Sequence, residues 1–334
     1  MAYTSRHSSY LLGSVGATLQ VVAGWWDVYS HLLFGSVDPW WNLAHFTLYA
    51  GIAIVILAVW RGLRVVQAPP LASVSLIRFV NVAGLKLAGL GSIMQVIAGI
   101  WNQIVHHVFL REPKIAPAHA LLTLGMLTIS LGMIIGLTIE YGMIRHGIIA
   151  VSPFKRLATL ACVVLVFASI WLAAAGSFIY VARVFRGTPI NWITAVLLAM
   201  VGTLVLVPAK RVLPRFGSAL LIGLFFNCVA YFFLVAYAEA QAYIPWGLLP
   251  LAMLDLLALA LNRIMKSTQA VLLSSTVTGL FFWATYYPFS LYLFPWSFSP
   301  LPAALLFAGS VVGALLGNGV YAELSSIVLP NTTP

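Results

Sequence analysis

Long apolar stretches separated by short polar connections run along the whole chain. A helix that crosses a bilayer needs about 20 mostly apolar residues, and the pattern predicts about ten such segments. Their expected ranges are 10–33, 43–61, 79–109, 118–144, 157–182, 191–208, 217–238, 246–263, 269–290 and 301–325. We therefore predict an all-α fold, a polytopic membrane helical bundle embedded in the lipid bilayer.

Composition and charge support this prediction and set an orientation. The 334 residues are 62% hydrophobic and 7% charged, whereas a soluble domain carries about 25% charged residues. The net charge of +10 does not indicate nucleic-acid binding, because the basic residues are spread over short connections. Most of them fall at the N-terminus or in every second connection: Arg6, Arg61, Arg64, Arg78, Arg145, Lys155, Arg156, Lys210, Arg211, Arg215, Arg263 and Lys266. The positive-inside rule then predicts a cell-membrane protein with both termini in the cytoplasm and the first and third connections outside.

The first four segments contain an internal repeat. The stretch "VVAGWWDVYSHLLFGSVDPWWNLAHFTLYAG", from Val21, aligns with "VIAGIWNQIVHHVFLREPKIAPAHALLTLG", from Val96, with one gap. The paired positions are Trp26 and Trp101, Asp27 and Asn102, His31 and His106, and His45 and His119. We interpret residues 1–145 as duplicated helical hairpins and residues 146–334 as a further helical bundle. Weaker matches that begin at Val181 and Trp283 leave open whether this bundle holds degenerate copies or only shares membrane composition.

Imidazole side chains gather at the expected tips of the two hairpins. Of the 7 histidines, five lie there: His31, His45, His106, His107 and His119. A single histidine at a span end is more often an interfacial anchor. Ionisable groups at membrane depth are costly and usually functional, and this pattern occurs twice. It therefore favours a metal or cofactor site at the outer face.

The intervals between the histidines exclude a haem held by two histidines of one helix. The stretch from His31 to His45 contains Gly and Asp-Pro, and that from His106 to His119 contains Arg-Glu and two prolines, which break helices. One histidine should end a helix and the other should begin the next. Asp27 and His31 are four residues apart and share a helix face. The predicted metal ligands are Asp27, His31, His45, Asn102, His106 and His119, in one site or two.

Histidine with a carboxylate suits copper, iron or zinc. At these residues the chain resembles the C subunit of the copper membrane monooxygenases, the particulate methane and ammonia monooxygenases. That family carries Asp-x3-His-x12-His at a helix end and just past the following loop. His106 and His119 match the histidine spacing, and Arg111, Glu112, Pro117 and Gly125 match the surrounding residues. Asp27 and His31 supply the acid, although the interval to His45 is one residue longer and Asn102 replaces the acid in the second hairpin.

The resemblance implies copper as the cofactor, with iron and zinc left open. It also implies a monooxygenase-like subunit that oxidises a small-molecule substrate with O2, together with other membrane subunits of a complex. Whether the chain is itself an enzyme stays open, and no catalytic residue is assigned. Two other functions are also left open: a metal-binding or electron-transfer subunit that interacts with quinone, and a small-molecule transporter.

A few further polar residues lie in or near the predicted segments. Lys86 has two candidate ion-pair partners, Glu140 and Asp255, and a proton path is its other interpretation. Both acids lie near cytoplasmic segment ends and are expected to be hydrated, as are His7 and His146.

Overall fold

In a computed structural model of the chain, the described residues are 2–34, 42–64, 75–109, 117–147, 149–184, 190–214, 216–238, 248–266, 268–274, 276–277 and 300–328. Every regular element within these ranges is a helix, which confirms the all-α prediction. Most of the weak repeat that begins at Trp283 lies outside these ranges, as does most of the ninth predicted segment, 269–290.

The helices follow the apolar segments closely. They are α1 (Ala2–Phe34), α2 (Leu43–Arg64), α3 (Ser75–Phe109), α4 (Pro117–Arg145), α5 (Pro153–Val184), α6 (Ile190–Val212), α7 (Ser218–Ala238), α8 (Leu248–Leu261) and α10 (Pro300–Val328). Each corresponds to one predicted segment, with ends displaced by at most four residues except the start of α1, which lies at Ala2 and not at residue 10. The hydropathy pattern therefore located these helices correctly.

The described residues support fewer membrane spans than the sequence predicts. Among the described residues, 4 helices are long and apolar enough to cross a bilayer: Leu43–Arg64, Val82–Val105, Pro117–Arg145 and Pro153–Ser177. They indicate an integral membrane protein, but they do not support about ten spans. Helix α8 has only 14 residues, fewer than the roughly 20 that a span needs. Helix α1 carries Ser14, Thr18, Gln20 and Asp27, and these polar side chains lower its hydropathy.

Contacts divide the chain into two compact units. Unit 1 comprises Met1–Ala173 with Leu324–Pro334, and unit 2 comprises Ala174–Glu323. The sequence placed a boundary earlier, between residues 145 and 146. The first part of α5 belongs to unit 1 because it bonds to α1: Thr159 contacts His7, and Ser169 donates a hydrogen bond to Thr18.

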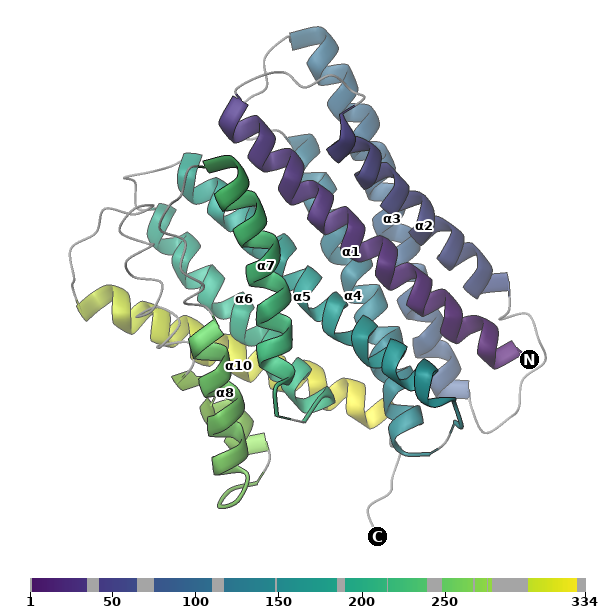
Figure 1. Ribbon diagram of the computed structural model, residues 1–334, viewed down its shortest axis with the longest axis vertical. Helices are drawn as coiled ribbons and strands as arrows, with labels where there is room; N and C mark the ends of the chain where they lie inside the picture. The colour runs from purple at the N-terminus through teal and green to yellow at the C-terminus, as the bar shows by residue number, and fades with distance from the viewer. Residues whose placement is uncertain are drawn as a thin grey trace. The chain divides into compact units, whose positions relative to one another are not determined.

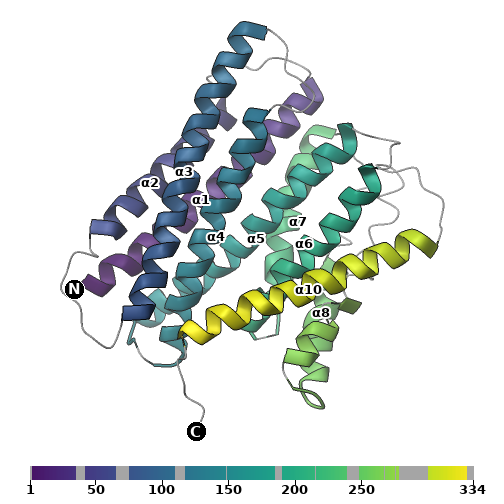
Figure 2. The ribbon, with the colours of Figure 1, turned by 180° about the vertical axis from the view of Figure 1, so that it is seen from behind.

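Unit 1 consists of two similar helical hairpins, α1 with α2 and α3 with α4, and Figures 1 and 2 show the helices of each pair side by side. Each pair crosses at facing glycines. A Cβ atom on Gly16 would lie 2.8 Å from the carbonyl oxygen of Gly51, and one on Gly91 would lie 2.6 Å from that of Gly125. Real Cβ contacts are longer, so glycine permits the same close approach in both hairpins.

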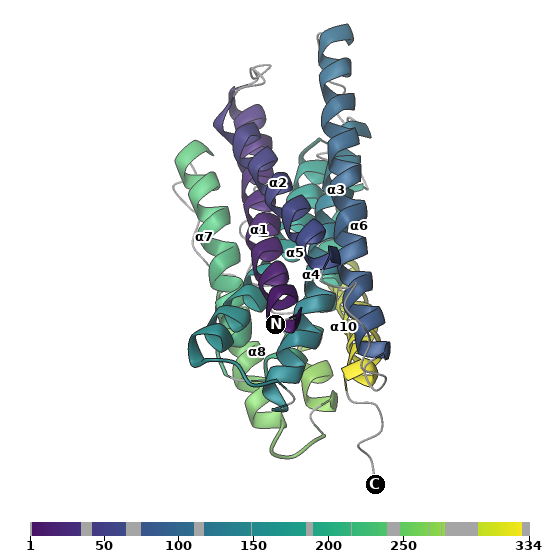
Figure 3. The same ribbon diagram turned by 90° about the vertical axis from the view of Figure 1, so that its right-hand side faces the viewer.

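The two hairpins also pack against each other in an approximately twofold manner. Tyr10 of α1 fills the space beside Gly136 of α4, where an added Cβ would lie 1.9 Å from the ring. Leu85, at the equivalent position of α3, fills the space beside Gly62 of α2, at 2.6 Å. Figure 3 shows the N-terminal ends of α1 and α3 at the same end of unit 1. The repeat found in the sequence is therefore a repeat of structure.

Within unit 2, α6 and α10 pack through a second series of glycines. Cβ atoms on Gly309, Gly313 and Gly317 would meet backbone oxygens of α6 at 2.9, 2.1 and 2.8 Å. The oxygens belong to Val196, Met200 and Leu204, so the two helices run parallel along this seam. The Thr203 hydroxyl donates a hydrogen bond of 3.0 Å to the Ser310 carbonyl. Small residues let helix backbones approach closely in membranes.

Replacing Gly313 with alanine should therefore destabilise the protein by about 1–3 kcal/mol, because a backbone oxygen cannot move aside as a side-chain tip can. The control is Gly319→Ala on the same helix, where no atom lies within 4 Å of an added Cβ. Alanine favours a helix over glycine, so this control should be neutral or stabilising by up to about 1 kcal/mol. Denaturant unfolding in detergent measures both, and equal stability of the two variants would contradict the packing described for Gly313.

Candidate metal centre

An acid and an imidazole meet at the tip of the first hairpin. Asp27 lies near the end of α1 and His45 lies in the first turn of α2. Their side chains are buried, 5% and 9% exposed, and His45 Nε2 lies 2.8 Å from Asp27 Oδ1. The contact joins two helices, as the sequence predicted, because α1 ends at Phe34 and α2 begins at Leu43.

The start of α2 fixes the position of His45. Asn42 precedes the helix, and its side-chain oxygen accepts a hydrogen bond of 2.6 Å from the backbone N–H of His45. Its carbonyl accepts the first helical hydrogen bond, from Phe46 at 3.0 Å. Asparagine is a preferred N-cap residue. The cap therefore holds the backbone of His45 in the orientation that faces α1.

Two aromatic residues lie near this pair along α1 and α2. Trp25, 4% exposed, donates a hydrogen bond of 2.8 Å from Nε1 to the Leu172 carbonyl of α5, which anchors α1 next to Asp27. The Tyr49 ring lies one turn after His45, with ring centroids 6.3 Å apart. A Cβ on Gly99 of α3 would lie 3.7 Å from the Tyr49 ring, so the second hairpin approaches this end of the first.

The second hairpin presents its equivalent residues at equivalent helix positions. Asn102 lies near the end of α3, and His119 lies in the first turn of α4, which begins at Pro117. Both side chains are half-buried. The Asn102 side-chain oxygen is buried and accepts no hydrogen bond. It is an oxygen donor available to a cation.

The structure brings together only part of the predicted ligand set. Asp27 and His45 are in contact, whereas the side chains of His31, His106 and His107 lie outside the described residues. Among the described side chains, no group of three or more His, Cys, Asp or Glu residues is arranged to hold a metal ion. The backbones of His31 and His106 are helical and lie one turn after Asp27 and Asn102, as expected from the sequence.

The donors at this tip fit a metal ion chemically. A carboxylate oxygen and an imidazole nitrogen bind divalent metals at about 2.0–2.2 Å, which places neighbouring ligand atoms roughly 3 Å apart. The 2.8 Å between His45 Nε2 and Asp27 Oδ1 is close to that separation. A small opening of the pair would admit one ion, with further ligands supplied from elsewhere. Without an ion, the same contact ties α1 to α2.

A second acid–imidazole pair lies at the other end of α1, and the sequence prediction for it was wrong. His7 and Glu140 were expected to be hydrated, but they are 4% and 0% exposed. His7 Nδ1 lies 3.3 Å from Glu140 Oε2, and its Nε2 lies 3.2 Å from the Thr159 hydroxyl. The three residues come from α1, α4 and α5. Nearness of Glu140 to the end of its predicted span does not by itself distinguish a hydrated charge from a buried one, because the three helices meet only in the fold.

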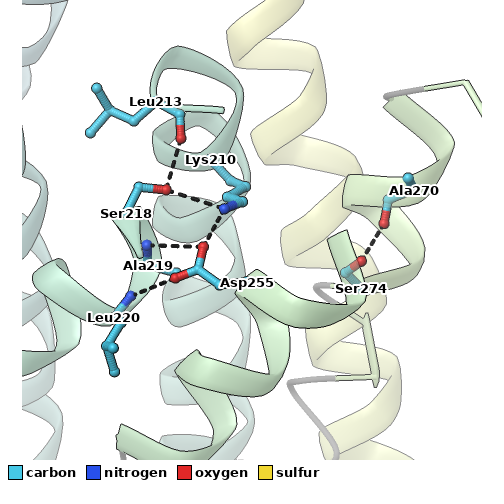
Figure 4. A network of polar contacts seen from close by, with 8 residues as sticks. All are labelled: Lys210, Leu213, Ser218, Ala219, Leu220, Asp255, Ala270 and Ser274. Carbon is cyan, nitrogen blue, oxygen red and sulfur yellow. Dashed lines mark hydrogen bonds and ion pairs between the residues drawn. The ribbon is translucent and has the colours of Figure 1, made fainter. Parts of the chain in front are cut away.

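The third buried pair, in unit 2, corrects the prediction for Lys86. Asp255, which is fully buried, pairs with Lys210 of α6, and Lys86 is exposed. Figure 4 shows how the Asp255 carboxylate also accepts hydrogen bonds from the backbone N–H groups of Ala219 and Leu220, at 3.4 and 3.0 Å. These belong to the first turn of α7, whose N–H groups have no partner inside the helix. Lys210 also donates a hydrogen bond of 3.3 Å to Ser218.

One further pair of polar residues was missed although the repeat contains it. Gln20 and Gln95 are separated by the same number of residues as Trp26 and Trp101. Both are 0% exposed, and neither side-chain amide has a hydrogen-bond partner. The stem of each packs against a glycine of its own hairpin, Gly51 or Gly125. Extending the alignment towards the N-terminus would have found them.

No protein-family model matches the chain, and neither the comparison with curated proteins nor the comparison with solved structures finds a match. The resemblance to the copper membrane monooxygenases thus stays a prediction carried by its motif residues.

Proposed function

We propose that the protein is a metal-binding integral membrane subunit of a monooxygenase-like complex. The observation that supports this most strongly is the buried contact between Asp27 and His45. Buried charged groups in membrane segments are costly and usually functional. The duplication of the hairpin, down to its glycine crossing, supports Asn102 and His119 as a second set of ligands.

In this proposal Asp27, His31 and His45 hold one ion. His106 and His119, with the side-chain oxygen of Asn102, hold a second ion or complete the same site. Copper is favoured by the family resemblance, and iron and zinc are the alternatives. Bound copper would supply the redox chemistry that activates O2 to oxidise a small-molecule substrate. The protein's own part is to orient the imidazoles, with Asn42 fixing His45, to limit water through Tyr49, and to anchor α1 to α5 through Trp25.

The proposal includes the finer topology expected from the sequence. Both termini lie in the cytoplasm of a chain with about ten spans, and both hairpin tips face outward. Other membrane subunits would complete the complex.

Substituting either partner of the contact should lower the metal content of the purified protein. We expect Asp27→Asn and His45→Ala to reduce copper affinity at least tenfold, because even residues behind the ligands contribute about 10–100-fold to metal affinity. Asp27→Asn retains the shape of the side chain and can still bond to His45, so it separates ligand loss from unfolding. Elemental analysis after copper loading and dialysis measures the effect.

The matched control is His146→Ala, which removes an exposed histidine distant from the hairpin tips. It should retain the copper content of the unchanged protein. If Asp27→Asn, His45→Ala and the unchanged protein bind equal amounts of copper, iron and zinc, the metal proposal is wrong and the contact is only a tie between helices.

A further inference from the structure

The approximate symmetry of unit 1 is broken by α5. This helix packs along α1: the Thr18 hydroxyl meets Ser169 at 3.1 Å, and the Trp25 indole meets the Leu172 carbonyl at 2.8 Å. The equivalent positions of α3 are Ile93 and Ile100, and both are 59% exposed. The face of α3 that corresponds to the α5-covered face of α1 is therefore open within unit 1.

The chemistry of the two faces also differs. The α1 face carries hydrogen-bonding groups that α5 satisfies. The α3 face carries a stripe of exposed aliphatic side chains: Leu90, Ile93, Ile97, Ile100 and Ile104. This stripe offers no hydrogen-bonding group to a partner helix. Branched aliphatic side chains suit lipid hydrocarbon.

Basic side chains lie at one end of this stripe. Arg61 and Arg64 are in the last turn of α2, and Lys86 is one residue after Leu85, which fills the space beside Gly62. All three cations are exposed. The Arg64 guanidinium lies over the ring of Trp60, 3.9 Å from its centroid.

No acidic side chain described in unit 1 neutralises these cations. The acids there are Asp27 and Glu140, both buried and both in contact with histidines. The residues of α4 equivalent to Arg61 and Arg64 are Ile135 and Thr138, and the residue of α1 equivalent to Lys86 is Leu11, so all three are uncharged. The basic cluster therefore occurs where α2 meets α3, beside the open face, and has no counterpart where α4 meets α1.

We propose that the exposed face of α3, together with the basic residues where α3 meets α2, binds an anionic phospholipid. Its phosphate lies among Arg61, Arg64 and Lys86, and an acyl chain follows the aliphatic stripe. From Lys86 to Ile100 the helix rises about 21 Å, which exceeds the roughly 15 Å of hydrocarbon in one leaflet. Basic pockets between membrane helices are known to bind anionic lipid headgroups. The site is independent of the proposed metal centre.

Lipid binding by the full-length protein in neutral detergent tests this site. Native mass spectrometry with phosphatidylglycerol or phosphatidylcholine should show that the unchanged protein retains the anionic lipid preferentially. Each basic residue near an anionic lipid raises the binding affinity by a factor of about five. The triple variant R61Q/R64Q/K86Q should therefore bind phosphatidylglycerol roughly a hundredfold more weakly. The single variant K86Q, with an expected loss of about fivefold, carries the test if the triple variant does not fold.

The matched control is R145Q/K155Q/R156Q, which removes two arginines and one lysine that are also exposed in unit 1. It should bind phosphatidylglycerol as the unchanged protein does, and soluble glycerol phosphate should not displace the lipid. Equal loss in the control, equal retention of phosphatidylcholine, or displacement by glycerol phosphate would overturn the proposal. Formation of a disulfide-linked dimer by I97C would also overturn the proposal, because a second copy of the chain would then cover the aliphatic stripe.

Discussion

Replacing Asp255 with leucine should lower the free energy of unfolding by about 3–5 kcal/mol, because it leaves the Lys210 ammonium buried without its counter-charge. Lys210 is 4% exposed and its pairing carboxylate 0% exposed. The same carboxylate accepts the backbone N–H groups of Ala219 and Leu220. One substitution therefore removes both an ion pair and the cap of α7.

The reverse substitution, Lys210→Met, should cost less. Asp255 would keep the two N–H groups at the start of α7, where negative charge is favourable. The double variant K210M/D255L buries no charge and should recover most of the loss. It should stay about 1 kcal/mol below the unchanged protein, because α7 still lacks its cap.

Denaturant unfolding in detergent measures these differences. Lys266→Met serves as the control, since it removes an exposed lysine of unit 2, and should change stability by no more than about 0.5 kcal/mol. A D255L variant as stable as this control would show that the pair contributes nothing to the fold. A double variant no more stable than D255L would show that the buried lysine is not the cause.

His7→Ala should have a comparable effect in unit 1, about 3–5 kcal/mol, because Glu140 is fully buried and loses its imidazole partner. Glu140→Gln retains the shape of the side chain without the charge and should cost much less. The double variant H7A/E140Q should therefore be more stable than H7A alone, although it has lost the same imidazole.

Thermal unfolding of the three variants, with His146→Ala as the control, provides the measurement. His146 is exposed, so its loss should be nearly neutral. If His146→Ala and His7→Ala unfold alike, the buried contact between α1 and α4 does not stabilise the fold. If E140Q fails to rescue H7A, the loss is one of packing and not of charge.

The positions of the helices were predictable because hydropathy alone places them. An apolar stretch bounded by charged residues must satisfy its backbone internally within a bilayer, and a helix does so along its own length. The break between His31 and His45 was predictable for the same reason, since Gly and Asp-Pro interrupt that pattern. The described helices do not support about ten spans, because a short apolar helix such as α8 resembles a span in composition but not in length.

The candidate site was predictable in part. The duplicated spacing predicted that Asp27 and His45 lie at the same hairpin tip, and in the structure His45 Nε2 is 2.8 Å from Asp27 Oδ1. The N-cap hydrogen bond from His45 to Asn42, and the position of the Tyr49 ring beside His45, depend on how α2 is rotated about its axis. Hydrophobic periodicity does not report that rotation when a helix is apolar on nearly all sides.

The sequence alone therefore determined that the chain is helical, that the first four helices form a repeated hairpin, and where the helices end at the hairpin tips. Each of these features depends on residues close together in the chain. The partners of the buried charges were decided by packing. His7 meets Glu140 and Lys210 meets Asp255 across sequence separations of 133 and 45 residues. Only the approach of helices, set by contacts such as Tyr10 against Gly136, brings one particular pair together in a medium that penalises an unpaired charge.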